Sequence, residues 1–347
     1  MDVSSPVQFE SWRAGQVPPV ERLRDGLWSI PVPMPKSSLR YTLAYAFESS
    51  GGVSIVDAGW NASVSWDGLV DGLATAGFKP GDLRALIATH AHTDHYGLAD
   101  RIRQASGARI ALHRADAATL SGARGAAGES GPAAWRELGR RIGTPAAAAA
   151  APSAASGTKK QSRRYEAQPA PDVLIDDGDQ VDLPGWNLRA IWTPGHSPGH
   201  VCYYEQDQGL LLAGDHVLPR ISPNVAVSTG QSANPLGDYL ASLAAIGDLP
   251  VTEVLPAHQY RFYGLRQRVQ ELTAHHEARL AQIEAIAAAG PGASCWEITS
   301  QLEWSRPFTS LPPKHMRAAA RETLAHLVLL QLRGRLRSEG GQPERWY

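Results

Sequence analysis

The 347-residue sequence predicts an α/β fold followed by a mainly helical C-terminal unit. Up to about residue 258, short apolar runs of strand composition alternate with segments of helical spacing. After that point the strand pattern stops and longer segments of helical spacing take over. The composition, with 43% hydrophobic and 19% charged residues, fits a soluble globular chain with room for one large domain and an appendage.

The first third of the chain alternates between strand and helix patterns. A Gly51-Gly52 pair separates its first two strand segments and predicts a hairpin. The expected strands are 40–47, 53–56, 83–88 and 108–113, and the expected helices are 66–76 and 96–106.

Residues 114–171 interrupt this alternation and are interpreted as an insertion. Residues 145–157 are nearly all Ala, Pro and Ser, and the pairs Lys159-Lys160 and Arg163-Arg164 follow. Such composition is typical of a flexible surface segment. The alternative is a mobile lid that brings positive charge to the mouth of a site.

The strand pattern resumes near residue 173 and ends near residue 258. The expected strands in this part are 188–192, 201–204, 210–213 and 251–255. We therefore place a first domain at residues 1–263, including the insertion at about 114–171.

The C-terminal unit, residues 264–347, is predicted to be mainly helical. A long helix over 265–289 ends at Gly290-Pro291-Gly292, and Ser294 with Glu297 forms a capping box that opens a short helix. A third helix runs from the proline pair at 312–313 to about residue 332, and the tail over 335–347 can form a small hairpin. Three helices and a hairpin resemble a winged-helix-like unit.

A dense group of ligating side chains follows the strand at 83–88. His90, His92, Asp94 and His95 lie within six residues, on a loop at the C-terminal end of a strand. Functional groups gather at such loops in α/β proteins. Imidazole and carboxylate groups at this spacing indicate a divalent metal site, and a pair of metals explains them better than one.

Three later loops carry further candidate ligands. His196 lies in the segment Thr-Pro-Gly-His-Ser-Pro-Gly-His, Asp215 lies in Ala-Gly-Asp-His, and His258 lies in Pro-Ala-His. Each follows a predicted strand. If these strands share a sheet, all four loops can meet at one edge.

Composition also bears on partners and location. The net charge of -1 gives no case for a nucleic acid or an acidic membrane surface as a partner. Cys202 and Cys295 are the only cysteines, so a reduced compartment is expected. The first ten residues lack a signal-peptide pattern, and no apolar run is long enough for a membrane span. We expect a cytoplasmic protein without a membrane partner.

The order of these motifs, H-x-H-x-D-H, then T-P-G-H-S-P-G-H, then G-D and a late His, resembles the metallo-β-lactamase-fold hydrolases. The resemblance covers roughly residues 27–258. It implies an αββα sandwich with a binuclear metal centre at one edge. The C-terminal unit resembles the winged-helix-like appendage of the branch that includes glyoxalase II-like hydrolases and the β-lactamase-like protein 2 group.

The resemblance also implies roles for individual residues. His90, His92 and His196 would hold one metal, Asp94, His95 and His258 a second, and Asp215 would bridge both. The histidines favour zinc, while the added carboxylates leave iron or manganese as alternatives. A hydroxide bridging the two metals would be the nucleophile, with Asp94 as the catalytic residue that orients or deprotonates it.

Other residues near these motifs are weaker candidates. In the family that this sequence resembles, the residue at the position of Asp57 supports the metal-binding loops without binding the metal itself. The alternative is that Asp57 is an ordinary turn residue. Tyr260 and Tyr263 could donate hydrogen bonds to a substrate, although packing is the favoured interpretation. Packing or support is also favoured for the remaining histidines near the motifs, His113, His200 and His216, and packing or domain contact for His275 and His276.

Individual residues within the motifs narrow the choice among the reaction types of this family. His92 stands where flavin-linked diiron members carry a glutamate, which disfavours redox chemistry. His95 and Asp215 differ from the true β-lactamases, which disfavours antibiotic hydrolysis as the main activity. The preferred function is hydrolysis of a small ester, thioester or lactone. Phosphodiester cleavage, including endoribonuclease activity, is the enzyme alternative, with the basic residues Arg261, Arg266 and Arg268 as its slight support.

A non-enzymatic alternative uses the C-terminal unit. It would bind nucleic acid while the metal domain acts as a sensor, but the last helix offers only Arg317, Arg321 and His326 as polar basic contacts. We therefore expect a small-molecule substrate rather than nucleic acid. The appendage is expected to pack on the hydrolase, to close one wall of the pocket or to form a homodimer.

Overall fold

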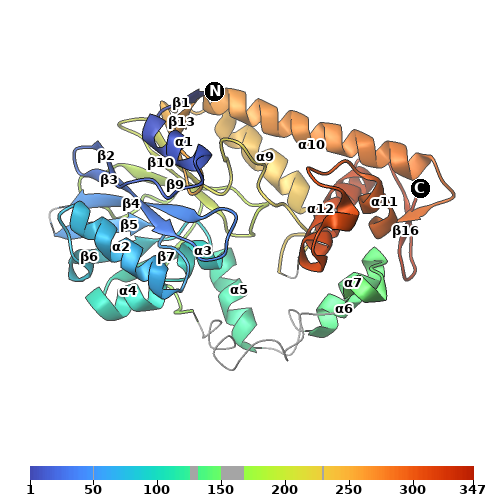
Figure 1. Cartoon of the computed structure of the whole chain (residues 1–347), viewed down its shortest axis with the longest axis horizontal. Coiled ribbons are helices and arrows are strands. Elements are labelled where there is room, and N and C mark those ends of the chain that lie inside the picture. The colour runs from blue at the N-terminus through green and yellow to red at the C-terminus, as the bar shows by residue number, and fades with distance from the viewer. Residues whose placement is uncertain (50, 126–131, 150–167, 229) are drawn as a thin grey trace.

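The computed structural model describes residues 1–49, 51–125, 132–149, 168–228 and 230–347. It shows two β-sheets packed face to face, with helices on both outer faces and further helices at the C-terminal end (Figure 1). The α/β class, the αββα sandwich and the C-terminal helical region are therefore confirmed.

The first sheet, over the described residues, has the strand order β2-β3-β4-β5-β6-β7-β8. The predicted hairpin is present, with Tyr45 opposite Val56 in an antiparallel pair. From β5 onward neighbouring strands pair in parallel, so their C-terminal ends meet at one edge. The bounds are β2 Glu21–Arg24, β3 Leu27–Pro33, β4 Tyr41–Ser49, β5 Gly52–Val56, β6 Leu83–Ile87, β7 Arg109–His113 and β8 Val173–Ile175.

The second sheet has the order β1-β13-β12-β11-β10-β9 among the described residues. Only β11 and β12 pair in parallel, while the other neighbours are antiparallel. The bounds are β1 Asp2–Val3, β9 Leu188–Trp192, β10 Val201–Glu205, β11 Leu210–Gly214, β12 Glu253–Pro256 and β13 Phe262–Tyr263.

Three apolar layers hold the sandwich together. Leu43 and Phe47 of the first sheet meet Tyr203 and Leu212 of the second between the sheets. The outer face of the first sheet is covered by α2 (Ser63–Thr75) and α4 (Ala99–Ser106), which follows the short α3 (Thr93–Tyr96). Each sheet thus buries both faces, which its mostly apolar strands require.

The outer face of the second sheet is covered by α9 (Pro235–Gly247), a helix that the sequence analysis missed. Its sequence did carry helix signals. The Asn234 side chain caps it by accepting a hydrogen bond from the Gly237 N–H, and Pro235 occupies the first turn. Leu236, Tyr239, Leu243 and Ile246 then recur on one buried face at helical spacing. The N-terminal helix α1 (Pro6–Arg13) was likewise not predicted.

The C-terminal unit contains α10 (Leu265–Ala288), α11 (Cys295–Gln301) and α12 (Pro313–Leu332), close to the predicted ranges. The predicted capping box of Ser294 and Glu297 is present. The tail forms the expected antiparallel pair of β15 (Ser338–Glu339) and β16 (Arg345–Trp346), extended by β14 (Ala293–Ser294). The apolar core runs without a break from the second sheet through α9 into α10 and α12, so the boundary at residues 263 and 264 crosses a shared core.

The described part of the insertion is helical rather than irregular, while most of the residues on which the flexible interpretation rested lie outside the described residues. This part forms α5 (Arg114–Gly125), α6 (Pro132–Ile142) and α7 (Ala146–Ala149), and Figure 1 shows α6 and α7 beside α12. The physical reason is that alanine favours helices and that Ile142 and Ala148 gain burial in the C-terminal core. Residues 150–167, which include the basic pairs, lie outside the described residues.

Several contacts tie the insertion to the C-terminal unit. The guanidinium of Arg317 donates to the Ala148 carbonyl at 2.8 Å, and Arg141 pairs with Glu344 at 2.7 Å.

The two cysteines, Cys202 and Cys295, are both buried and do not form a disulfide. Within the described residues, no helix has the length and apolar character needed to cross a membrane.

Candidate metal centre

The predicted ligands lie together at one edge of the sandwich. After β6 come His90 and His92 in a loop and Asp94 and His95 in the short helix α3, and the loop after β9 carries His196. Asp215 follows β11, and His258 follows β12. The fold thus brings together side chains that lie up to 168 residues apart in sequence, from His90 to His258.

Three imidazole nitrogens converge in the first group of this cluster. His92 Nδ1 lies 2.8 Å from His90 Nε2 and 2.9 Å from His196 Nε2. An imidazole nitrogen offers one in-plane site, either an N–H or a lone pair, so His92 Nδ1 can complete only one of these two contacts as a linear hydrogen bond. A cation placed among the three nitrogens removes this conflict.

The second group combines two imidazoles with a carboxylate. The Asp94 Oδ2 atom lies 3.4 Å from His258 Nε2 and 3.8 Å from His95 Nε2. His95 and His258 are fully buried, while Asp94 remains partly exposed. This set offers two nitrogens and one oxygen to a common point.

Asp215 lies between the two groups. Its Oδ1 is 3.3 Å from His258 Nε2, and its Oδ2 is 3.5 Å from His196 Nε2 and 3.6 Å from His95 Nε2. Its backbone N–H donates to His200 Nε2 at 3.1 Å, which fixes the loop. The two carboxylate oxygens therefore reach both groups, as a bridging ligand would.

Contacts on the far side of each ring set the direction of the imidazoles. The Nδ1 atoms of His196 and His258 donate to the backbone carbonyls of Asn224 and Tyr41, both at 2.9 Å. A carbonyl can only accept, so these rings carry their proton on Nδ1 and leave the inward nitrogen free when neutral. His90 Nδ1 contacts the Thr89 hydroxyl at 3.0 Å.

Asp57 supports the loop after β6 from behind. Its carboxylate accepts hydrogen bonds from the Thr89 N–H and hydroxyl and contacts His95 Nδ1 at 2.8 Å. Its backbone is left-handed, with φ at 60°, and Gln259 beside His258 is also left-handed at 74°. A left-handed backbone raises the free energy of a non-glycine residue, and such strained residues concentrate at functional sites.

The sequence analysis missed Asp116, which joins two ligand loops. Its buried carboxylate accepts from the Ala91 N–H at 2.7 Å, the Gly199 N–H at 2.6 Å and the Ser197 hydroxyl at 3.0 Å. It thereby ties the loop of His92 to the loop of His196. Only its place after β7, three residues beyond His113, could have drawn attention to it.

Replacing Asp116 by alanine is expected to weaken metal binding at the site of His90, His92 and His196 by about 10- to 100-fold. The substitution leaves two buried N–H groups without their acceptor and loosens both loops. Metal titration against a chromogenic chelator measures the effect. Asp116→Asn, which keeps one oxygen, serves as the partial control, and an unchanged affinity in Asp116→Ala would contradict this role.

The buried polar atoms of the cluster that lack a hydrogen-bond partner fit a bound metal cation. Among the residues that the structure describes, His95 Nε2, His258 Nε2 and Asp215 Oδ1 find no hydrogen-bond partner. Buried polar atoms rarely remain without a partner. Here both imidazole nitrogens lie beside the Asp215 carboxylate, His258 Nε2 at 3.3 Å from Oδ1 and His95 Nε2 at 3.6 Å from Oδ2. Their donor types are those that divalent transition metals bind in proteins.

The electrostatics of His90 and Asp215 favour the protonation states that a metal requires. At His95 and His258, burial would lower the pKa but the neighbouring aspartates raise it, so a metal must displace a proton there. Burial, with the neighbouring imidazoles, lowers the pKa of His90 well below its usual value. Burial alone would raise the pKa of Asp215, but His258 and His95 hold that pKa well below its usual range. His90 is therefore neutral and Asp215 ionised at neutral pH, as metal ligands must be.

The remaining candidates lie outside the cluster or beside it. Tyr260 is buried against Phe9 and Trp12, with ring centroids 5.0 and 5.4 Å apart, as the packing alternative predicts. Tyr263 is exposed on β13, paired with Asp2. A role for either tyrosine toward a substrate stays a prediction.

The other histidines make packing or supporting contacts. His113 stacks on Trp192, while His200 accepts the Asp215 N–H. His276 is buried against Tyr239 and His326, which is the domain contact that was favoured for it.

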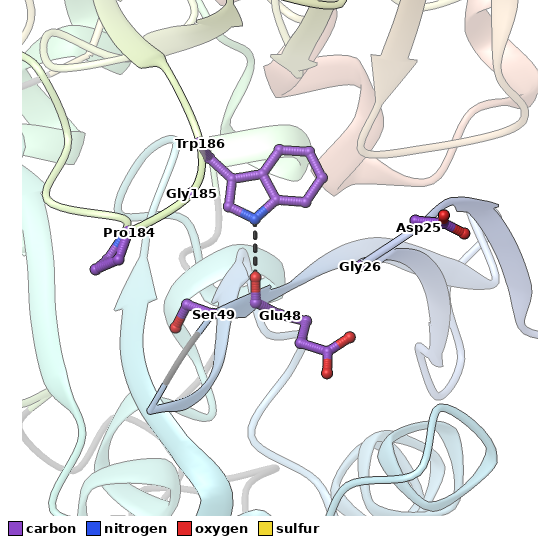
Figure 2. A pocket seen from close by; sticks show the side chains of 7 residues that line it. All are labelled: Asp25, Gly26, Glu48, Ser49, Pro184, Gly185 and Trp186. Atoms are coloured by element: carbon purple, nitrogen blue, oxygen red, sulfur yellow. Dashed lines mark hydrogen bonds between the residues drawn. The ribbon is translucent and has the colours of Figure 1, made fainter.

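A surface pocket of about 490 Å³ lies away from the cluster. Figure 2 shows that it is formed by the turns at Gly26 and Ser49 and by Trp186, whose indole N–H donates to the Glu48 carbonyl at 2.9 Å. These turns stand at the opposite end of β4 and β5 from Asp57 and the ligand loops. The pocket is therefore not part of the candidate centre.

Comparison with known proteins points to one family. The family model described as "Metallo-beta-lactamase superfamily" matches residues 38–258. The crystal structure of a metallo-beta-lactamase family protein from Thermus thermophilus aligns with a TM-score of 0.77 at 30% sequence identity, covering 94% of this chain and 99% of that chain.

Curated relatives match over shorter stretches. A hydroxyacylglutathione hydrolase from Ectopseudomonas mendocina (strain ymp) is 26% identical over 204 residues, or 58% of each chain. The lactamase-like protein adaB from Aspergillus niger is 33% identical over 110 residues, or 31% of this chain and 32% of adaB. The match thus spans about a third of the fungal relative and under two thirds of the hydrolase.

Proposed function

Since this chain belongs to the metallo-beta-lactamase superfamily, we propose that it is a binuclear metal-dependent hydrolase of a small ester, thioester or lactone. The observation that carries the proposal is the position of Asp215, whose two carboxylate oxygens reach both groups of histidines. A bridging carboxylate is useful only if two cations are bound close together.

We assign the ligands by these two groups. His90, His92 and His196 would hold one cation, Asp94, His95 and His258 the other, and Asp215 both. Zinc is the favoured ion because most donors are imidazoles, with iron or manganese as alternatives.

The chemistry divides between the ions and the protein. When bound, divalent cations lower the pKa of water from about 15.7 to about 7 and polarise the carbonyl under attack. Asp94 is the partly exposed carboxylate of the cluster, so it can accept a hydrogen bond from the attacking water and orient it. Asn224, Tyr41 and Asp57 hold the imidazoles in place through their Nδ1 atoms.

The cluster opens toward solvent at His92. This imidazole is exposed, whereas His90, His95 and His258 are buried. A substrate would therefore approach from the side of His92 and Asp94. An acyl group is preferred over a phosphate because the basic residues that favoured phosphodiester cleavage are engaged elsewhere.

Two of those basic residues are buried in internal contacts, and the third is paired with a carboxylate at the surface. Arg261 is buried in ion pairs with Glu253 and Glu21, Arg268 is buried against backbone carbonyls, and Arg266 pairs with Asp248 at 2.9 Å. They do not form a free basic surface for a phosphate chain. The relationship to a hydroxyacylglutathione hydrolase supports a thioester as the first substrate to test.

The metal-sensing alternative needs a basic surface on the last helix. Arg321 there donates to the Val227 carbonyl at 2.7 Å, Arg317 donates to Ala148, and His326 is buried. These residues serve contacts within the chain, which argues against a recognition helix.

The substrate proposal is tested with purified protein reconstituted with zinc, manganese or iron. The panel contains thioesters, lactones, a chromogenic phosphodiester, a cephalosporin and a short RNA. We expect kcat/KM for a thioester or lactone to exceed that for the phosphodiester by at least about tenfold, a difference of about 1.4 kcal/mol in transition-state binding. The His196→Ala variant controls for contaminating hydrolases. A preference for the phosphodiester or RNA would overturn the assignment.

A further inference from the structure

The loop between Asp215 and α9 links the candidate metal centre to the C-terminal helices. Its residue Asn224 offers the backbone carbonyl that accepts from His196 Nδ1 at 2.9 Å. The direction of the His196 ring therefore depends on where this carbonyl lies. This carbonyl lies on a connecting loop, where no regular strand or helix hydrogen bonds fix the backbone. Other contacts must therefore hold it in place.

Arg268 of α10 holds the part of the loop before Asn224. Its Nε donates to the Leu218 carbonyl at 2.7 Å and its Nη2 to the Ile221 carbonyl at 3.0 Å. The side chain is buried, and its Nη1 pairs with Glu271 at 3.0 Å, which fixes the guanidinium on the helix. A planar guanidinium that holds two carbonyls fixes the path of the chain between them.

Arg321 of α12 holds the part of the loop after Asn224. Its Nε donates to the Val227 carbonyl at 2.7 Å, and the Val227 N–H donates back to the Arg321 carbonyl at 3.2 Å. Ile221 and Val227 each lie three residues from Asn224. Two helices of the C-terminal unit thus clamp the loop on both sides of the carbonyl that orients His196.

We propose that Arg268 and Arg321 are positioning residues of the metal centre, which makes the C-terminal helices part of the site of His90, His92 and His196. The inference rests on the proposed ligand role of His196. The apolar core that runs unbroken from the sandwich into these helices gives the clamp a rigid base.

The clamp acts on one group of ligands more than on the other. His95 is oriented by Asp57 and His258 by the Tyr41 carbonyl, and both of these partners belong to the first sheet and its loops. The stretch of loop that Arg268 holds also touches the other group, since the Arg220 N–H donates to the Gln259 side chain beside His258 at 2.9 Å. Loss of the Arg268 contacts should therefore weaken metal binding at His90, His92 and His196 more than at the other site. A general loss of stability would weaken both alike.

The experiment compares Arg268→Ala with Arg266→Ala in the full chain. Arg266 lies on the same helix, is exposed and pairs only at the surface with Asp248 among the contacts described. Stepwise zinc affinities are measured by chelator competition, and cobalt spectra report the coordination of each site. Thermal unfolding of the metal-free proteins checks that each variant is folded.

We expect Arg268→Ala to weaken binding at the site of His90, His92 and His196 by about 10-fold, the lower end for groups that orient a ligand, and to weaken the other step by a smaller factor. Arg266→Ala should change neither step. If Arg268→Ala fails to fold, Arg321→Ala tests the same clamp from the other side of Asn224. Equal weakening of both steps, or no weakening in a folded variant, would overturn the inference.

His196→Ala separates this inference from the proposed function. If His196→Ala removes one binding step and Arg268→Ala does not weaken that step, the clamp is wrong and the ligand assignment stands. If wild-type protein shows no stepwise binding, or His196→Ala leaves both steps intact, the proposed ligand set itself is wrong.

Discussion

Replacing Asp215 by asparagine is expected to lower metal content at both proposed sites and to reduce turnover by on the order of 10³-fold. Asparagine keeps the shape of the side chain but removes its charge and one of its two acceptor oxygens. Those oxygens lie 3.3 Å from His258 Nε2 and 3.5 Å from His196 Nε2, one toward each group. Metal catalysis contributes several kcal/mol of transition-state stabilisation, which corresponds to a loss of this order.

Metal content after gel filtration and kcat on the best substrate of the panel measure this effect. Asp71→Asn, an exposed carboxylate on the outer helix α2, is the matched control and should retain both. An Asp215→Asn protein with two metals per chain and full turnover would show that Asp215 does not bridge the sites.

Replacing His258 by alanine is expected to remove one metal ion and to leave the other. His258 belongs to the group with Asp94 and His95, while His90, His92 and His196 meet around His92 Nδ1, although His90 also lies within reach of His95 and Asp215. Bound metal should therefore fall from two equivalents to one, with turnover reduced by on the order of 10²-fold or more because one polarising charge is lost. Metal analysis of the purified variant and single-substrate kinetics give both numbers.

His315→Ala, at an exposed position on α12, is the control for histidine substitution in general. Two equivalents of metal in a folded His258→Ala protein would show that His258 is not a ligand. Comparison with Asp215→Asn then separates a ligand of one site from a ligand of both.

Local patterns in the sequence predicted the parts of this fold that depend on neighbouring residues. The hairpin of β4 and β5, the strand before His90 and the helices α10 and α12 appear where apolar periodicity placed them. The capping box of Ser294 needs only four consecutive residues, and it is present. The density of His90, His92, Asp94 and His95 likewise indicated a metal site without any knowledge of the fold.

Where prediction failed, the stabilising partners were distant in sequence. The helices α6 and α7 pack on α12, whose sequence begins more than 160 residues later. The Ala-, Pro- and Ser-rich composition suggested a flexible insertion, and periodicity cannot show which surface its helices will bury against. The missed helix α9 is a different case, because its sequence alone contains the capping residue Asn234 and apolar residues at helical spacing.

The sequence by itself determined which chemical groups are present and at which strand ends they stand, because those depend on residue type and local periodicity. Only the tertiary structure decided how they meet. It placed Asp215 between two groups of histidines, tied two loops together through Asp116, and put Arg268 and Arg321 on either side of Asn224. These are contacts between residues tens to hundreds of positions apart, and packing of the sheets and helices sets them.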